Sequence, residues 1–309
     1  MPIAWRSVRC TMRLPGLLVA LTASCERANN AVSRTDTTLP PPASAVESLR
    51  TTNLARHWDS SAGTALLVRD DSITRAIYPT VTQLDSTAVL DEALVRGFAA
   101  DAVAPSGSAG PLQIRGFAPI DEECAVWPAV SLSMDSARAW TVAFQRGVAT
   151  ALELRPIESL ASSDSARLAA ELTRLAATLP NDTVRAFRGL PFVIRAAHGF
   201  TPVAGVDAVV AEVARRVNVE ANPREETLLL VAERASGSRE WRVAYSQRAS
   251  GAEAHVERAT PLAAVKLGAT AVPTLVLERA GSDWIVYAFV QRQPDGRWRA
   301  SWESAYSGC

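Results

Sequence analysis

Histidine is the side chain best suited to acid and base chemistry near neutral pH, and this chain contains three: His57, His198 and His255. His198 has the most suggestive position, because it lies in Ala197-His198-Gly199-Phe200 at the expected end of a strand. A serine and an aspartate brought to it by folding would complete a hydrolytic site, whose members need not be neighbours in the sequence. The competing interpretation is a solvated or structural histidine, and no serine can be nominated as the nucleophile.

Motifs for other chemistry are missing from the sequence. It has no Gly-x-Ser-x-Gly turn, no His-Glu-x-x-His pair, no glycine-rich phosphate loop and no EF-hand spacing. Two acidic runs, Asp121-Glu122-Glu123 and Asp70-Asp71, carry oxygen ligands suited to a hard cation, but solvated loops explain them more simply. We therefore nominate no catalytic, cofactor-binding or metal-binding residue, and we expect no cofactor.

Four tryptophans near the C-terminus, Trp241, Trp284, Trp298 and Trp302, allow two interpretations. They could line a ligand groove, but at strand spacing such residues more often anchor a sheet to its core. The leading functional hypothesis is therefore a non-catalytic binding or structural module, and the alternative is a hydrolase that uses His198. A third hypothesis, an assembly factor that works by strand addition, requires a long unprotected edge strand.

The first residues have the pattern of an export signal. Arg6, Arg9 and Arg13 form a positive region, and residues 14–21 form an apolar stretch too short to span a bilayer as a helix. The segment Leu21-Thr22-Ala23-Ser24-Cys25 that follows resembles the lipobox of bacterial lipoproteins. This resemblance covers only the beginning of the chain, and it implies cleavage before Cys25 and diacylation of the Cys25 sulfur.

The resemblance predicts a signal peptide over residues 1–24 and a lipid-anchored protein of the bacterial cell envelope. Two or three acyl chains hold a protein stably on a membrane, whereas a single chain does not. Glu26 stands where the family uses aspartate for retention in the inner membrane, so the outer membrane is expected in a cell that has one. Thr22 and Ser24 differ from the commonest lipobox, and ordinary signal-peptidase cleavage is the alternative.

After Cys25 the sequence changes from a tether to a folded body. Residues 25–45 are polar and contain Pro40-Pro41-Pro42, so we expect a semi-extended tether. Residues 46–309 suffice for a single α+β domain or for two closely packed halves with a boundary near 181–190. The 32 basic residues balance the 32 acidic ones, so no basic field favours nucleic acid. The expected partners are the membrane and an envelope protein.

Two of the four cysteines remain available for pairing if Cys10 leaves with the signal peptide and Cys25 carries lipid. These are Cys124 and Cys309, in a compartment that favours disulfides. Cys309 is also the last residue of the chain, and a chain end frays unless something holds it. We therefore predict a disulfide between them, the alternative being two separate thiols.

The C-terminal region predicts three strands, over 273–279, 283–292 and 297–306. Gln293-Pro294-Asp295-Gly296 forms the turn before the last strand, because proline presets φ and glycine accepts a positive φ. The middle strand is apolar on both faces and should lie centrally in its sheet. Alternation along the last strand places Trp298, Trp302 and Tyr306 on one face.

Periodicity predicts the remaining elements. They are helices over 85–98 and 162–179, strands over 63–69, 111–118 and 192–197, and a hairpin pairing 140–144 with 148–154. Residues 207–220 suit a helix or a strand, and their β-branched content favours a hairpin with 227–234. A cap at Thr260, Pro261 at the first helical position and Gly268 at the end indicate a further helix over 260–268. The segment 230–235 resembles 275–280, and two similar hairpins of one sheet explain this likeness without a repeat architecture. The predicted fold class is α+β, a predominantly antiparallel sheet with hairpins and a few packed helices.

Overall fold

The computed structural model describes residues 58–84, 90–119, 124, 126–133, 139–180, 185–217 and 222–308. The signal peptide, Cys25, the tether, His57, the acidic run 121–123 and Cys309 lie outside these residues. What the sequence predicts about them stays a prediction. Within the described part, all strand pairings are antiparallel.

The N-terminal sheet is formed by β1 (Leu66–Asp70), β2 (Ile73–Ile77), β3 (Ala99–Ala104), β4 (Gly107–Phe117), β5 (Val130–Leu132) and β6 (Val142–Gln145). Their order across the sheet is β2-β1-β6-β3-β4-β5. The two end strands meet, because Arg75 forms a bridge with Ala129 and the Ala76 amide donates to the Pro128 carbonyl at 3.0 Å. This sheet therefore curves back until its edges are joined.

The central sheet is formed by β7 (Ala149–Leu152), β13 (Arg258–Leu267), β14 (Val272–Ala280), β15 (Trp284–Arg292), β16 (Trp298–Glu303) and β17 (Ser307–Gly308). Its order is β16-β15-β14-β13-β7, and β17 pairs with β15. The prediction that residues 283–292 form a central strand is confirmed, since β15 has β14 and β16 as neighbours and contributes to cores on both of its faces.

The outer sheet is formed by β8 (Arg155–Pro156), β9 (Val193–Phe200), β10 (Val206–Val217), β11 (Arg224–Ala235) and β12 (Arg242–Ala252), in the order β12-β11-β10-β9-β8. The predicted hairpin of 207–220 with 227–234 is confirmed as β10 and β11. The predicted helix over 162–179 is confirmed as α1 (Ser162–Thr178), whose Leu172, Leu175 and Ala176 are buried. Short 3-10 turns complete the elements: η1 (Ser60–Ala62), η2 (Glu92–Leu94), η3 (Ile157–Ser159) and η4 (Arg185–Phe187).

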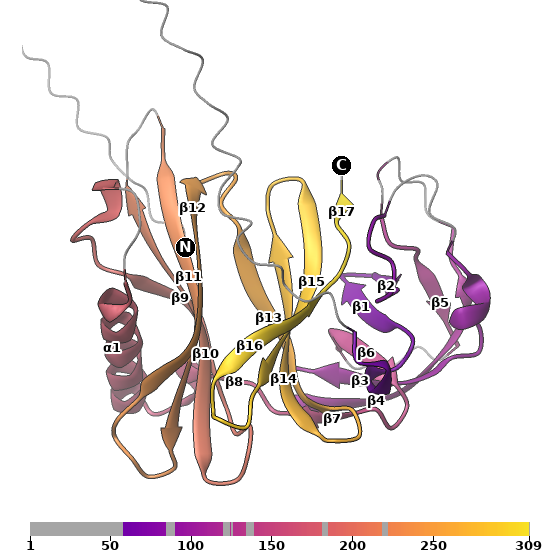
Figure 1. Cartoon of the computed structure of the whole chain (residues 1–309), viewed down its shortest axis with the longest axis horizontal. Coiled ribbons are helices and arrows are strands. Elements are labelled where there is room, and N and C mark those ends of the chain that lie inside the picture. Colours follow the sequence, from indigo (N-terminus) through magenta and orange to yellow (C-terminus); the bar gives the residue numbers. More distant parts are fainter. Residues whose placement is uncertain are drawn as a thin grey trace, which may run out of the picture. The chain divides into compact units, whose positions relative to one another are not determined.

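The sheets and the helix are stacked as layers, in the order α1, outer sheet, central sheet and N-terminal sheet (Figure 1). The first core, between the N-terminal and central sheets, includes Trp127, Phe144, Val265, Phe289 and Trp302. The second core, between the central and outer sheets, includes Leu229, Val231, Leu275, Leu277 and Trp298. The third core, between the outer sheet and α1, includes Leu172, Val209, Leu228 and Leu230.

The predicted turn at residues 293–296 is confirmed in its details. Gly296 has a φ of 78°, and its amide donates to the Gln293 carbonyl at 2.9 Å. The Asp295 carboxylate accepts from the Arg297 amide at 2.9 Å, as an aspartate in a turn commonly does. Local turn chemistry therefore sets the path of the chain between β15 and β16.

The prediction that Trp298 and Trp302 share one face of the last strand is wrong. Val290 pairs with Ala300 and Phe289 with Trp302, so Ser301 is an extra residue in β16. Such a β-bulge reverses the alternation of side chains beyond it. Trp298 consequently lies in the second core and Trp302 in the first core.

The helix predicted over 260–268 is also wrong, because this segment is strand β13. Pro261 lies at a bulge, where its missing N–H is tolerated, and Leu262 is the extra residue. After the bulge, Val265 contacts the first core and Ala264 the second core. An apolar run covered on both faces is typical of a central strand, and this outweighs the cap-like Thr260-Pro261 start.

Two further predictions, a helix over 85–98 and a hairpin of 140–144 with 148–154, are wrong. From residue 90 onward the predicted helix over 85–98 contains only the turn η2, in which Leu94 is 49% exposed, and β3 begins directly afterwards. Strands β6 and β7 exist, but they do not form the predicted hairpin. The turn at Gly147, with a φ of 79°, carries the chain from the N-terminal sheet to the central sheet.

The fold is predominantly antiparallel sheet, as predicted, but the described residues contain one α-helix where a few were expected. The difference arises from 85–98, where apolar spacing resembles that of a helix, and from 260–268, where the residues at both ends resemble helix caps. The division of residues 46–309 into one domain or two halves near 181–190 stays a prediction.

Candidate functional site

His198, the residue of the hydrolase hypothesis, lies on β9 opposite Val210 of β10 and Pro156 of β8. It is half-buried, and its Nδ1 makes no hydrogen bond to any described residue. Burial lowers the pKa of His198, and the nearby Glu158 carboxylate partly offsets this. The imidazole therefore favours its neutral form, and its Nδ1 forms no hydrogen bond to a serine within the described chain.

A different histidine contacts a serine. His255 Nδ1 lies 3.0 Å from Ser282 Oγ, and Ser282 Oγ in turn donates to Asp283 Oδ1 at 3.2 Å. In a catalytic triad the carboxylate orients the histidine, whereas here it contacts the serine, and all three residues lie in exposed turns. We interpret this contact as a link between the turn before β13 and the turn before β15.

The tryptophans are mainly core residues. Trp298 and Trp302 are buried in separate cores, and Trp241 stacks under Arg234 with the guanidinium carbon 4.5 Å from the ring centroid. Trp284 packs edge-on against Tyr306. These four side chains consequently do not line a common groove.

No group of three or more histidine, cysteine, aspartate or glutamate side chains that could hold a metal is found among the described residues. Asp70 and Asp71 lie at the turn between β1 and β2.

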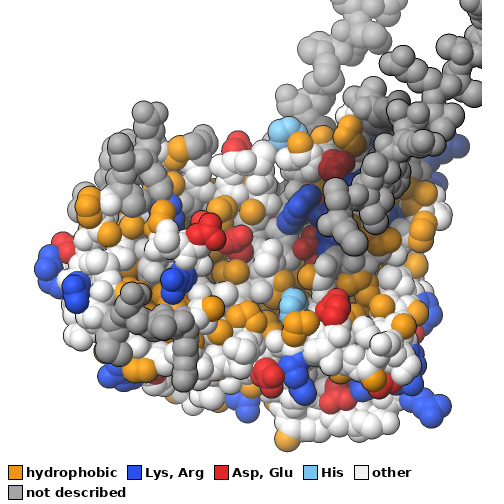
Figure 2. Space-filling model, turned by 180° about the vertical axis from the view of Figure 1, so that it is seen from behind, with side chains coloured by type: hydrophobic (Ala, Val, Ile, Leu, Met, Phe, Trp, Pro, Cys, Tyr) orange, Lys and Arg blue, Asp and Glu red, His pale blue; other side chains and the backbone are white. Residues whose placement is uncertain are grey.

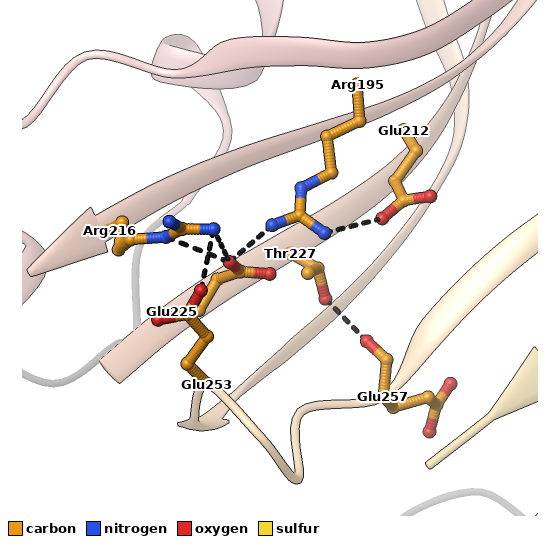
Figure 3. Close-up of polar contacts among 7 residues, drawn as sticks. All are labelled: Arg195, Glu212, Arg216, Glu225, Thr227, Glu253 and Glu257. Carbon is orange, nitrogen blue, oxygen red and sulfur yellow. Dashed lines mark hydrogen bonds and ion pairs between the residues drawn. The ribbon is translucent and has the colours of Figure 1, made fainter. Parts of the chain in front are cut away.

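A set of charged and polar side chains lies between the outer and central sheets, at a place where sequence analysis predicts no site. This inter-sheet cluster consists of Arg195, Glu212, Arg216, Glu225, Thr227, Glu253 and Glu257 (Figure 3). Glu225 is fully buried and Glu212 is only 8% exposed. Buried carboxylates are rare unless they are paired, so this cluster is an unusual chemical environment for the space between two sheets.

Strand register brings the members of the inter-sheet cluster together. Glu225 of β11 lies opposite Arg216 of β10, and their side chains are 3.2 Å apart. A bulge in β9 makes Arg195 an extra residue beside Glu212, which turns its side chain toward the second core. Arg195 forms an ion pair with Glu225 and approaches Glu212 to 3.9 Å.

The carboxylates of the inter-sheet cluster are unequally satisfied. Thr227 Oγ1 donates to the backbone carbonyl of Glu257 at 2.8 Å, while the Glu257 carboxylate accepts from Arg279 Nε at 2.7 Å. Arg216 contacts the Glu253 carboxylate at 2.8 Å. Glu212 Oε1 and Glu225 Oε1, by contrast, accept no hydrogen bond within the described part of the chain. Glu212 also borders a cavity of about 10 Å³, comparable to one water molecule, together with Gln247 and Glu257.

Burial raises the pKa of the Glu212 carboxyl, and Glu225 adds to this effect, while Arg195 and Arg258 oppose it. Glu212 therefore holds its proton more tightly in the folded protein than in the unfolded chain. The cluster supplies acidic groups and one hydroxyl, Thr227 Oγ1, and that hydroxyl is already engaged with the backbone carbonyl of Glu257.

A larger cleft, of about 400 Å³, lies beside the turn that precedes β13. Arg258 and Thr260 of β13 and Glu278 of β14 contribute to its lining. Burial raises the pKa of Glu278, and the nearby Asp70 raises it further. The volume suits a small ligand, but Arg258 is exposed and the cleft is open, so its geometry selects no particular chemistry.

The sequence of β11 contains a pattern that indicates buried glutamates, but periodicity alone does not show which residues pair with them. Alternation along β11 puts Glu225, Thr227, Leu229, Val231 and Glu233 on one face, and both ends of this face are acidic. A strand buried on both faces should lack charges at inward positions unless arginines are supplied by its neighbours. Recognising the site therefore requires knowing which strands flank β11.

Replacing Glu212 by glutamine is expected to change how stability depends on pH. Because the folded-state pKa of Glu212 is raised, the folded protein binds more protons than the unfolded chain between the ordinary and the raised pKa. Stability contributed through Glu212 is therefore lost as pH rises through that window. Urea unfolding from about pH 4 to about pH 8 should show Glu212→Gln gaining stability relative to wild type as pH increases.

The control for this experiment is Glu240→Gln, a substitution of an exposed glutamate that precedes β12. It removes the same kind of charge from an exposed site and so accounts for the general effect of the substitution. A difference from wild type that stays constant with pH for Glu212→Gln would contradict the assigned direction of the Glu212 shift.

The chain matches no family model, no curated protein and no solved structure. Among the helices of the described residues, none has the length and apolar character needed to cross a membrane.

Proposed function

We propose that this protein is an exported, lipid-anchored component of the bacterial cell envelope, whose folded body is a non-catalytic binding or structural module. The observation that carries the proposal is the N-terminal order of Arg6, Arg9 and Arg13, an apolar stretch, and small residues directly before Cys25. The anchor would hold the body at the membrane through the proline-containing tether. Glu26 after the cysteine favours the outer membrane where one exists.

The character of the folded body supports a module without catalysis. Two of its strongly buried carboxylates are engaged by arginines of other strands: Glu226 with Arg215 and Arg248, and Glu233 with Arg292. Charges arranged in this way stabilise contacts between strands and sheets. A binding role would use surfaces that the layers leave open, and a pull-down with the membrane-anchored form would identify an envelope partner.

Replacing Cys25 by serine is expected to abolish lipid attachment completely, since the thiol is the group that is acylated. Cells fed a labelled fatty acid should mark the wild-type protein and not Cys25→Ser, and the variant should leave the membrane fraction. The matched control is Cys10→Ser, which changes a cysteine inside the predicted signal peptide and should still be labelled. Equal labelling of wild type and Cys25→Ser, or labelling of neither, would refute the lipoprotein assignment.

A further inference from the structure

Strand β12 lies at the edge of the outer sheet, with β11 as its neighbour on one side and no strand on the other in the described residues. It is long, running from Arg242 to Ala252. None of its side chains is fully buried, whereas the neighbouring β11 is almost entirely buried. An edge of this kind presents backbone donors and acceptors that another strand can use.

The register of β12 shows which backbone groups point outward. The Glu253 amide donates to the Pro223 carbonyl at 2.9 Å, and this pair continues the β11–β12 register. Because hydrogen-bonded pairs alternate along an antiparallel ladder, Ala249 and Gly251 direct their backbone groups toward β11. Ser246, Arg248 and Ser250 therefore direct theirs away from the sheet.

The outward edge has few of the features that normally prevent strand addition. The register shift of this pair lies opposite Val231 and Ala232, so the segment from Tyr245 to Ala252 is regular. That segment contains no proline and a single charged residue, Arg248. Arg248 contacts the buried Glu226 at 2.6 Å, which neutralises its charge toward an incoming strand.

Other sheet edges in the described chain are shorter, closed or irregular. The ends of the N-terminal sheet are joined through Arg75 and Ala129. Strand β16 is short and carries the bulge at Ser301, and β9 carries the bulge at Arg195 and is partly covered by β8. Both bulges interrupt the regular ladder that an added strand needs. The segment from Tyr245 to Ala252 is thus the most regular open edge.

We propose that β12 is a self-association surface, on which β12 of a second copy adds as an antiparallel strand to make one continuous sheet across two protomers. An antiparallel pair of identical strands has two-fold symmetry, the commonest symmetry of protein dimers. With the axis at Ala249, Ser250 faces Arg248 of the other copy, and Ser246 faces Ala252. This register keeps the two arginines from lying directly opposite each other, a like-charge arrangement that destabilises strand pairs.

The chemistry of β12 favours its own copy as the occupant. The side chains after Arg248 are Ala249, Ser250, Gly251 and Ala252, all small, so they do not clash with those of the facing copy. The whole chain has a formal net charge of zero, and Figure 2 shows basic and acidic side chains interspersed on one face of the molecule, so no overall repulsion separates two copies. The dimer does not depend on the lipid anchor, because the edge belongs to the folded body.

The mass of the full chain, purified in a mild detergent and measured by light scattering with the detergent subtracted, tests this proposal. Wild type should have twice the monomer mass, and Ser250→Pro should have the monomer mass, because proline removes an outward-pointing N–H. Ala249→Pro, by contrast, would remove a hydrogen bond between β12 and β11 and should disturb the strand itself. Comparing the two variants therefore separates loss of the dimer from loss of strand β12. Ser250→Pro should keep the circular-dichroism spectrum of the wild type.

A covalent trap tests the register itself. Ala249 and its copy form a pair without hydrogen bonds at the two-fold axis, where facing Cα atoms lie about 4.5 Å apart. Ala249→Cys should consequently give a disulfide-linked dimer on mild oxidation, and Ser246→Cys should not. A monomeric wild type, a dimer that persists in Ser250→Pro, or no cross-link with Ala249→Cys would overturn the proposal.

Discussion

Replacement of Glu233 by alanine is expected to lower the free energy of unfolding by about 3–5 kcal/mol. Glu233 lies on β11 and is only 1% exposed. Its carboxylate accepts from Arg292 Nε at 2.8 Å and from Arg292 Nη2 at 3.1 Å, a bidentate arrangement. Trp298 Nε1 donates to the same carboxylate at 2.7 Å.

The size of this effect follows from what the substitution leaves behind. Arg292 and Trp298 belong to the central sheet and Glu233 to the outer sheet, so the three side chains connect two layers. Without the carboxylate, the Arg292 side chain, 14% exposed, would retain an uncompensated buried charge. The indole N–H of Trp298 would also lose its acceptor. Glu233→Gln should cost less, because an amide oxygen still accepts one of these bonds.

Denaturant unfolding of the wild type, Glu233→Ala, Arg292→Ala and the double variant measures the coupling of the pair. The double variant should cost less than the sum of the single variants, since each single change already breaks the same interaction. Glu153→Ala is the control, because Glu153 and Arg155 are 3.9 Å apart with side chains 58% and 60% exposed. Such a surface pair is worth at most about 1 kcal/mol. A similarly small loss for Glu233→Ala would contradict the role assigned to it.

The likeness between residues 230–235 and 275–280 predicts similar hairpins of one sheet, and this prediction is wrong about the sheet. The two segments lie on β11 and β14, in different sheets. Leu230 faces the third core and Leu275 the second core, so both segments point their leucines the same way through the stack. Sequence similarity predicted two similar strands correctly, but it carries no information on how sheets are stacked.

Turns and helices could be predicted from the sequence where they depend on residues that are close together in the chain. The turn at Gly296 and the leucine spacing of α1 depend on residues close in sequence, and both predictions are confirmed. Bulges at Ser301 and beside Pro261 depend on the partner strand, because an extra residue is defined only relative to a facing one. The inter-sheet cluster depends on arginines from several strands, and for this reason the sequence did not reveal it.

Loss of the predicted disulfide between Cys124 and Cys309 is also expected to lower the free energy of unfolding by a large amount. Closing a loop of this length restricts the unfolded chain by about 5 kcal/mol in the entropy model, although measured gains are commonly smaller. The pairing remains a prediction, since Cys309 lies outside the described residues. The structure supplies a reason to expect the two regions to share surroundings. Trp127, soon after Cys124, is buried in the first core, and Ile285, which pairs with Ser307 of β17, packs against the same core.

Single and double substitutions distinguish a disulfide from two separate thiols. If the cysteines are bonded, then Cys124→Ser, Cys309→Ser and the double variant should lose about the same stability, because each removes the same crosslink. Reductant should lower the stability of the wild type toward that of the variants and should leave the variants unchanged. Peptide mapping under non-reducing conditions, on protein exported to the periplasm, should recover the two cysteines in one linked fragment. Recovery of both as free thiols, with additive effects of the two substitutions, would show that no crosslink ties the end of the chain to the region around Cys124.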